Sequence, residues 1–318
     1  MTQENPTCCT PQNSVKKNIS KPIDYKKIKS NNTSKKKFEG KMIDFNNGDY
    51  LMGTDYEKSF VSDGEGPIRK VKFKKFSISE TSVTNKDFLK FIKDTNYITD
   101  AEKFGWSFCF FDSLSENEKN KVNFWTQGSE WWCRVDGAKW NSPEGPKTNI
   151  ENKMDHPVVH ISWNDANAYC RWSGNRLPSE IEWEYAARGG LEQALYPWGD
   201  ELLVEGKHMC NIWQGTFPSK NECSDGYFTT APAKSYEPNN FGLYNVVGNV
   251  WEWTSDWFTR YHNNNNSKPP KTGNTKVIKG GSFLCHESYC NRYRVAARSS
   301  NTTDSSTANM GFRIAKNF

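Results

Sequence analysis

The sequence predicts a compact, loop-rich domain of short strands and short helices rather than a doubly wound sheet. Aromatic residues make up 14% of the 318 residues, with 13 Trp, whereas the hydrophobic content is only 35%. Bulky rings rather than aliphatic runs must therefore fill the interior. The chain is long enough to bury a substantial core without cross-links. From about residue 191 onward, turns and loops outnumber segments with a helical period.

The first 37 residues form a basic tail that precedes a nearly neutral domain. Ten lysines and three acidic residues lie between Met1 and Lys41, and the formal net charge of the whole chain is +5. The tail has few apolar residues and no regular period, so we expect it to be flexible. It lacks interleaved aromatic residues, so we expect no nucleic-acid partner. We assign residues 1–37 to the tail and residues 38–318 to the domain.

Targeting signals and cysteine usage indicate a reducing compartment. No apolar segment near Met1 resembles a secretory signal, and no run is long enough to span a bilayer. We therefore expect a cytoplasmic protein without a membrane partner. The nine cysteines are odd in number and scattered, unlike the even framework of a small secreted domain. Most of them are expected to be reduced.

The segments after the tail predict strands and then a helix. Residues 38–54 (FEGKMIDFNNGDYLMGT) predict a strand, an Asn-Gly turn and a second strand. Residues 68–79 (IRKVKFKKFSIS) alternate apolar and basic residues, which predicts one strand with a solvent face. Thr84, with Asp87 three residues later, predicts the N-terminus of a helix whose phenylalanines face the core.

Residues 104–152 predict irregular structure, because tryptophans alternate there with glycines and prolines. We expect these rings to be buried in ordered loops, and they are Trp106, Trp125, Trp131, Trp132 and Trp140. Two capped helices follow. Ser162 with Asp165 predicts one, and Ser179 with Glu182 predicts another that ends at Gly189.

Two histidines lie four residues apart, at His156 and His160. Pro157 and the β-branched residues after it favour an extended chain, in which both side chains share a face. A metal role is therefore open, but structural histidines are the better interpretation. Cys170 lies on the apolar face of a predicted helix, which favours a buried small hydrophobe over a nucleophile.

Loops rich in Asn, Asp and Gly offer candidate sites for a hard cation. Asn211 with Asp225 is one candidate, and Asn245 with the carbonyls of Val246 and Gly248 is another. Side-chain and carbonyl oxygens of this kind bind calcium. Each signal is weak by itself, because the same residues also make turns without a metal.

The most unusual stretch is GGSFLCHESYC, which begins at Gly280 and places Cys285 five residues before Cys290. Two thiols make a poor zinc site, because zinc prefers four such ligands. They suffice for a soft ion of low coordination number such as Cu(I), which leaves a position open for a substrate thiolate. A disulfide is the equal alternative. Three arginines follow, which lower thiol pKa values, bind acidic groups or form structural ion pairs: Arg292, Arg294 and Arg298.

These residues resemble a known family. The run GGSFLCHESYCNRYRVAARSSNTTDSSTANMGFR closely resembles the signature of the formylglycine-generating enzymes, the aerobic sulfatase-modifying factors. The resemblance extends, in the family's order, over AEKFGWSF, WWCRVDGAKWNSPEG, DHPVVHISWNDANAYC, RLPSEIEWEYAARGG, CNIWQG, PNNFGLYNVVGNVWEWTSDW and GFRIA. It covers residues 38–318, so it is too long and too ordered to arise by chance.

The resemblance implies a single α+β domain of the sulfatase-modifying-factor type, related to C-type lectin folds and low in regular secondary structure. It also implies an enzyme that uses O2 and Cu(I) to convert the cysteine of a Cys-X-Pro-X-Arg segment to Cα-formylglycine. The partner would be an unfolded or nascent sulfatase, which this modification activates. We expect the enzyme to be a monomer.

Site residues also follow from the resemblance. Cys285 and Cys290 match the copper-binding pair, Ser282 matches the active-site serine, and Trp251 matches an aromatic residue that lines the reaction pocket and contacts the substrate. We expect Arg298 to contact the substrate as well. Two calcium sites (Ca2+) map onto backbone and side-chain oxygens of Asn211, Ile212, Asp225 and Tyr227, and of Asn245, Val246, Gly248 and Val250.

Some residues depart from the family pattern. Val295, Ala187 and Ile314 stand where vertebrate members have cysteine, so Cys170 lacks its expected disulfide partner. Cys8 and Cys9 resemble paired cysteines near the N-terminus of some members. The alternative function is a non-catalytic paralogue that binds sulfatases or other ligands, and the retained cysteine pair argues against it.

Overall fold

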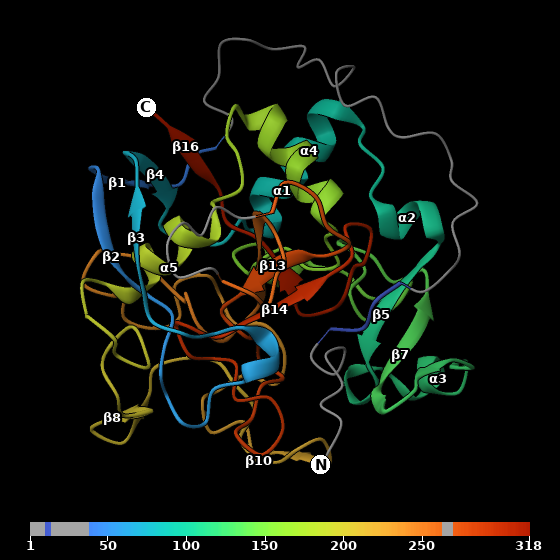
Figure 1. Ribbon diagram of the computed structural model, residues 1–318. Coiled ribbons are helices and arrows are strands. Elements are labelled where there is room, and N and C mark those ends of the chain that lie inside the picture. Colours follow the sequence, from blue (N-terminus) through green and yellow to red (C-terminus); the bar gives the residue numbers. More distant parts are fainter. Residues whose placement is uncertain (1–9, 14–37, 263–269) are drawn as a thin grey trace.

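The computed structural model describes residues 10–13, 38–262 and 270–318 (Figure 1). The helices are α1 (Asn85–Thr95), α2 (Asp100–Phe104), α3 (Glu116–Lys119), α4 (Trp163–Ser173) and α5 (Glu180–Arg188). The strands are β1 (Met42–Phe45), β2 (Gly48–Met52), β3 (Arg69–Phe73), β4 (Phe76–Ser79), β5 (Trp106–Phe110), β6 (Trp125–Thr126), β7 (Ser129–Asp136), β8 (Leu203–Val204), β9 (Lys207–His208), β10 (Gly215–Thr216), β11 (Lys220–Asn221), β12 (Trp251–Trp257), β13 (Lys276–Lys279), β14 (Arg298–Asn301), β15 (Met310–Gly311) and β16 (Ala315–Asn317). The fold is therefore α+β and rich in loops, as the sequence predicts.

A four-stranded sheet forms the centre of the molecule, in the order β14-β13-β12-β15. β12 pairs antiparallel with β13 and parallel with β15. Figure 1 shows α1 and α4 above this sheet, β2 and β3 on the left, and β5 and β7 on the right. The cysteine segment lies in the loop between β13 and β14, so the central sheet positions it.

The predicted N-terminal strands are confirmed, but with one difference. The expected single strand over residues 68–79 is two strands, β3 and β4, which separate at Lys74 and Lys75. β3 pairs with β2 and has alternating burial, whereas β4 is buried throughout between β1 and β16. The chain must leave one sheet to enter the next, and alternation along the sequence does not reveal that step.

The three predicted helix starts are confirmed. Thr84, Ser162 and Ser179 each accept a hydrogen bond from the backbone amide three residues later, in complete capping boxes. α5 ends at Gly189, whose φ of 60° is left-handed. Such caps satisfy backbone donors that the helix itself leaves without a partner. They can be predicted from the sequence because the capping residue and its partner are only three residues apart.

The prediction of irregular structure over residues 104–152 is wrong for β5 and β7, which pair in full antiparallel register. The short helices α2 and α3 were also not predicted. Trp106, Trp132 and Trp140 are buried as expected, whereas Trp125 is 43% exposed. In β5 the rings alternate with Ser107 and Cys109, but the whole strand is buried and has no polar face, and in β7 the adjacent Trp131 and Trp132 interrupt the period of two.

Part of the tail packs against the domain. Thr10 and Pro11 are buried, and the backbone amide of Asn13 donates to Ser305 Oγ at 2.7 Å. For Thr10–Asn13 this differs from the expectation of a flexible tail. Cys8, Cys9 and the lysine-rich part of the tail lie outside the described residues. Within the described part of the chain, no helix is both long and apolar enough to cross a membrane.

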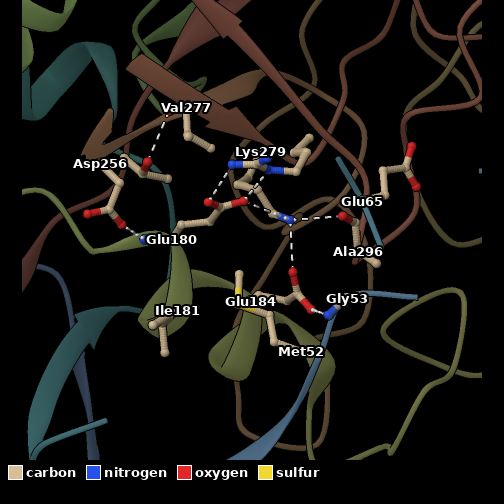
Figure 2. A network of polar contacts seen from close by, with 12 residues as sticks. Met52, Gly53, Glu65, Glu180, Ile181, Glu184, Asp256, Val277, Lys279 and Ala296 are labelled. Carbon is tan, nitrogen blue, oxygen red and sulfur yellow. Dashed lines mark hydrogen bonds and ion pairs between the residues drawn. The ribbon is translucent and has the colours of Figure 1, made fainter. Parts of the chain in front are cut away.

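Buried ion pairs connect α5 to the central sheet (Figure 2). Lys279, at the end of β13, donates to Glu184 Oε2 at 3.0 Å and to the Ala296 carbonyl at 3.2 Å. Both charged side chains are almost fully buried. Burial by itself raises the pKa of Glu184, but Lys279 and Arg188 outweigh it and lower the pKa to about 2. Glu184 is therefore charged at neutral pH, and the pair is a fixed part of the core.

Replacing Lys279 with Met should lower the free energy of unfolding by about 3–5 kcal/mol, because it removes one of the two buried cations that pair with Glu184 and leaves only Arg188. The control is Lys70→Met, since Lys70 pairs with Asp49 at the surface, where an ion pair contributes about 0–1 kcal/mol. Denaturant unfolding of both variants measures the difference. Equal losses would contradict a structural role for the buried pair.

Candidate active site

The cysteine loop begins with a tight glycine turn after Lys279. Gly280 and Gly281 have φ values of 95° and 72°, a region that other residues rarely adopt. A Cβ atom on Gly281 would lie 2.9 Å from the Arg292 carbonyl oxygen, closer than real contacts allow. The turn therefore lies directly against the segment that follows the loop, and only glycine permits that approach.

The loop brings Cys285 and Cys290 together. Both side chains are 1% exposed, and their Sγ atoms are 3.1 Å apart. A disulfide bond measures about 2.05 Å, so the two sulfurs are adjacent but not bonded. The backbone amide of Cys290 donates to the His286 carbonyl at 2.8 Å, which closes the loop into a turn. The pair is arranged to face a single reactant or a single ion.

Ser282 lies beside the pair and has a defined orientation. Its backbone amide is 3.4 Å from Cys285 Sγ, and its Oγ accepts from Asn309 Nδ2 at 2.9 Å. The backbone amide of Trp251 donates to the backbone carbonyl of Asn309 at 2.8 Å. Sequence reasoning assigned no role to Asn309, because the asparagine lies 27 residues from Ser282.

The side chain of Trp251 lies in the main core rather than at the surface. It is 0% exposed and belongs to the same hydrophobic cluster as both cysteines. Its indole nitrogen has no hydrogen-bond partner among the described residues. The ring is fully buried, and the expectation that Trp251 lines the reaction pocket and contacts the substrate stays a prediction.

Three half-buried rings instead reach the surface next to Cys290. We call Trp131, Phe217 and Tyr289 the aromatic wall. Tyr289 stacks on Phe217 with ring centroids 4.3 Å apart and meets Trp131 edge-on at 4.8 Å. The indole nitrogen of Trp131 is buried and has no hydrogen-bond partner in the described part of the chain. Sequence reasoning missed this wall, because its members come from three distant segments.

The three arginines after the loop are structural. Arg292 pairs with Asp63 at 2.5 Å, and Arg294 binds both carboxylate oxygens of Glu65. The prediction that some of these arginines form ion pairs is thus confirmed for each of them.

Arg298 pairs with both oxygens of Glu180, and its Nη1 also donates to the carbonyls of Asp63 and Thr259. The side chain is 2% exposed. These internal partners favour a structural role for Arg298, and the expectation that it contacts a substrate stays a prediction.

Hydrogen bonds join residues of the first predicted calcium site to one another. Asp225 accepts the backbone amides of Ile212 at 3.1 Å and of Tyr227 at 3.0 Å. Asn211 Oδ1 is buried and has no hydrogen-bond partner among the described residues. Gln214 donates its amide group to the Ile212 carbonyl and to Asp225 Oδ2. Burial raises the pKa of Asp225. An orphaned amide oxygen beside a desolvated carboxylate fits a hard cation.

The second predicted calcium site is next to the first. Asn245 Oδ1 is likewise buried without a partner within the described ranges, and Val246 and Val250 are buried on the same loop. A Cβ atom on Gly248 would lie 2.5 Å from the Asn211 carbonyl oxygen, so the two loops touch. The residues present fit a cation here too, with an amide oxygen and backbone carbonyls as ligands.

The histidines have structural partners. His160 is fully buried between Ser107 Oγ and the Pro143 carbonyl, both at 2.8 Å, and burial lowers its pKa to about 4. His156 contacts Thr230 Oγ1 at 2.9 Å. Cys170 is buried in the main core, and burial raises its pKa. Across the described residues, no three His, Cys, Asp or Glu side chains gather as a metal cluster.

Comparison with known proteins agrees with this geometry. The model of the "Sulfatase-modifying factor enzyme 1-like domain" matches residues 27–318. The chain belongs to this family. It is 51% identical over 281 residues to a protein named formylglycine-generating enzyme from Thermomonospora curvata, covering 86% of this chain and 92% of that protein.

Two further relatives mark the range of the family. The chain is 43% identical over 277 residues to the "Inactive C-alpha-formylglycine-generating enzyme 2" of Bos taurus, covering 86% of this chain and 87% of that protein. Among solved structures, PvdO from Pseudomonas aeruginosa matches with a TM-score of 0.65 and 24% identity, over 89% of this chain and 97% of that one. This last likeness shows the fold alone, and the relation to C-type lectins stays a prediction.

Replacing Gly281 with Ala should displace the cysteine loop, lowering the free energy of unfolding by more than about 3 kcal/mol and exposing both thiols. The control is Gly105→Ala, since Gly105 has a similar φ of 77° but no atom within 4 Å of a new Cβ. That control should cost about 1–2 kcal/mol. Denaturant unfolding and the rate of thiol alkylation in the native protein measure both effects. Similar results for the two variants would contradict the close packing.

Proposed function

We propose that this protein converts the cysteine of a Cys-X-Pro-X-Arg segment in a sulfatase to Cα-formylglycine, with O2 as oxidant. The observation that supports it most is the adjacent pair of buried sulfurs, Cys285 and Cys290, beside an oriented serine. Membership in the sulfatase-modifying-factor family and the names of its relatives agree with this activity. In the balanced change, R–CH2–SH, O2, two electrons and two protons give R–CHO, hydrogen sulfide and water, and an external thiol supplies the electrons.

The residues present fit Cu(I). Two buried sulfurs 3.1 Å apart offer soft ligands, with no cluster of His, Asp and Glu around them in the described part of the chain. Thiolates of this kind select Cu(I) over harder metals. Cys285 and Cys290 would hold the ion, and bound copper would supply the electron-transfer chemistry with O2. Ser282 then keeps its backbone N–H 3.4 Å from Cys285 Sγ, where it donates a weak hydrogen bond to that sulfur.

The aromatic wall offers a place for the client segment. A proline ring packs well on flat aromatic faces, and an extended segment presents its backbone carbonyls to nearby donors. Trp131 supplies the aromatic face, because its half-buried ring meets that of Tyr289 edge-on. Its indole nitrogen is buried, so the donors to the client backbone come from other residues. We infer that the client lies extended across Trp131 and Tyr289, with its cysteine toward Cys290.

A non-catalytic role is the second candidate, because an inactive relative shares 43% identity. The adjacent sulfurs argue against it, since a binding module needs no such pair. We also propose that the protein works in a reducing compartment such as the cytoplasm. In support, no disulfide joins any of the cysteines in the described ranges. The monomeric state stays a prediction.

Conversion of a client peptide tests the activity directly. The peptide Leu-Cys-Thr-Pro-Ser-Arg, incubated with the protein, Cu(I), a thiol reductant and O2, should show the mass change for –CH2–SH becoming –CHO. The matched control is the double variant Cys285→Ser, Cys290→Ser, which should leave the peptide unchanged because both soft ligands are absent. Mass spectrometry measures the product. An unchanged peptide with the copper-loaded wild type would favour the non-catalytic role.

We propose that Ca2+ binds at both Asn sites, where it would satisfy Asn211 Oδ1 and Asn245 Oδ1. Adding calcium at 100 times its Kd should then raise the free energy of unfolding by about 2.7 kcal/mol for each site. Asn211→Ala should remove one site's share of this increase. Asn120→Ala, at an exposed helix end, is the control and should keep the full increase. Thermal unfolding with calcium or chelator measures it, and no calcium effect on the wild type would overturn the proposal.

A further inference from the structure

Four residues of the basic tail are bound to the domain in a defined way. Thr10 is 0% exposed and Pro11 is also buried. The Pro11 carbonyl accepts from Asn301 Nδ2 at 3.2 Å, and the Asn13 amide donates to Ser305 Oγ at 2.7 Å. These hydrogen bonds use the backbone of the segment, as in recognition of an extended peptide. The match to the family model begins only at residue 27, so the segment lies outside it.

The place where the segment binds is continuous with the cysteine site. In Figure 1 the segment runs between β14 and β5, and Ser305 follows β14 in the chain. The neighbouring Ser306 carbonyl accepts from the amide of Phe108, in β5, at 3.4 Å. Phe108 shares a hydrophobic cluster with Leu284, which precedes Cys285.

A second path joins the same loop to the active serine. Thr307 donates its hydroxyl to Asn309 Oδ1 at 2.7 Å, and Asn309 donates to Ser282 Oγ at 2.9 Å. The residues that bind the tail segment are therefore the start of the short loop that orients Ser282.

The sequence of the segment adds a chemical reason for this location. Residues 9–13 are Cys-Thr-Pro-Gln-Asn, which match the first four positions of the client motif Cys-X-Pro-X-Arg and place Asn13 where the motif has arginine. Pro11 is thus the counterpart of the client proline, and it is buried. A segment that keeps the proline but lacks the arginine would bind the same surface more weakly than a true client.

We infer that the surface around Asn301 and Ser305 is part of the client site, that Thr10–Asn13 is an internal, client-like ligand of this surface, and that the segment must leave before a sulfatase segment binds. This inference rests on the proposed function. Covalent attachment compensates for weak binding, because a tethered segment has an effective concentration on the order of millimolar. A client must therefore compete with a ligand that is always present. The apparent affinity for the client is the intrinsic affinity multiplied by the fraction of molecules from which the segment has dissociated.

The test compares two truncations with the full chain. Removing residues 1–13 should lower the KM of the peptide Leu-Cys-Thr-Pro-Ser-Arg by roughly tenfold with kcat unchanged, the factor expected for a segment docked about nine-tenths of the time. Removing residues 1–7 leaves the segment intact and should change nothing. The full-length variant Pro11→Asp, which should expel the segment without a deletion, is expected to behave like the longer truncation.

A synthetic peptide of residues 7–14 provides the second measurement. Labelled with a fluorophore, it should bind the chain that lacks residues 1–13, and the unreactive client analogue Leu-Ser-Thr-Pro-Ser-Arg should displace it. Equal KM values for all variants, or tail peptide that the analogue does not displace, would overturn the inference. If no variant converts the client but the analogue still displaces the tail peptide, the proposed oxidation is wrong. The inference that the tail and the client bind the same site is then still supported.

Discussion

The structure depends on ion pairs that are buried in its interior. Lys279 and Glu184 are at most 1% exposed, and each of the three arginines that follow the cysteine loop ends on a buried carboxylate. Removing water from such ions costs several kcal/mol each, and that cost is recovered only if each charge meets its partner in good geometry. The pairing therefore permits very few arrangements of the segments that carry these ions.

Those segments surround the cysteine loop on both sides. Lys279 ends the strand before it, and Arg292 begins the run after it, so both ends of the loop are held by ion pairs. The partners lie on α5 and on residues 61–65, far away in the sequence. A loop with fixed ends can bring two thiols within 3.1 Å in an apolar interior, where a flexible loop would separate them. The charge network thus supports the chemistry without touching it.

The sequence predicted those features that depend only on residues within one short segment. Capping boxes at Thr84, Ser162 and Ser179 predict the three longest helices, because the backbone donors and their acceptors lie within four residues. The cysteine pair could be predicted for the same reason, because Cys285 and Cys290 are only five residues apart. The pair β5 and β7 was not predicted, since β5 is buried along its whole length and has no polar face, and adjacent tryptophans interrupt the alternation in β7.

By itself, the sequence determined the domain, its loop-rich α+β class, the capped helices and the family, and it placed Cys285, Cys290 and Ser282 within one short loop. Only the tertiary structure decided that Arg298 is an ion-pair partner of Glu180, that Trp251 lies in the main core, and that part of the tail is bound. The physical reason is the separation along the chain between the residues that interact. Hydrogen bonds within a turn connect neighbours in the chain, whereas burial and charge pairing connect residues more than 100 positions apart, and no local pattern records them.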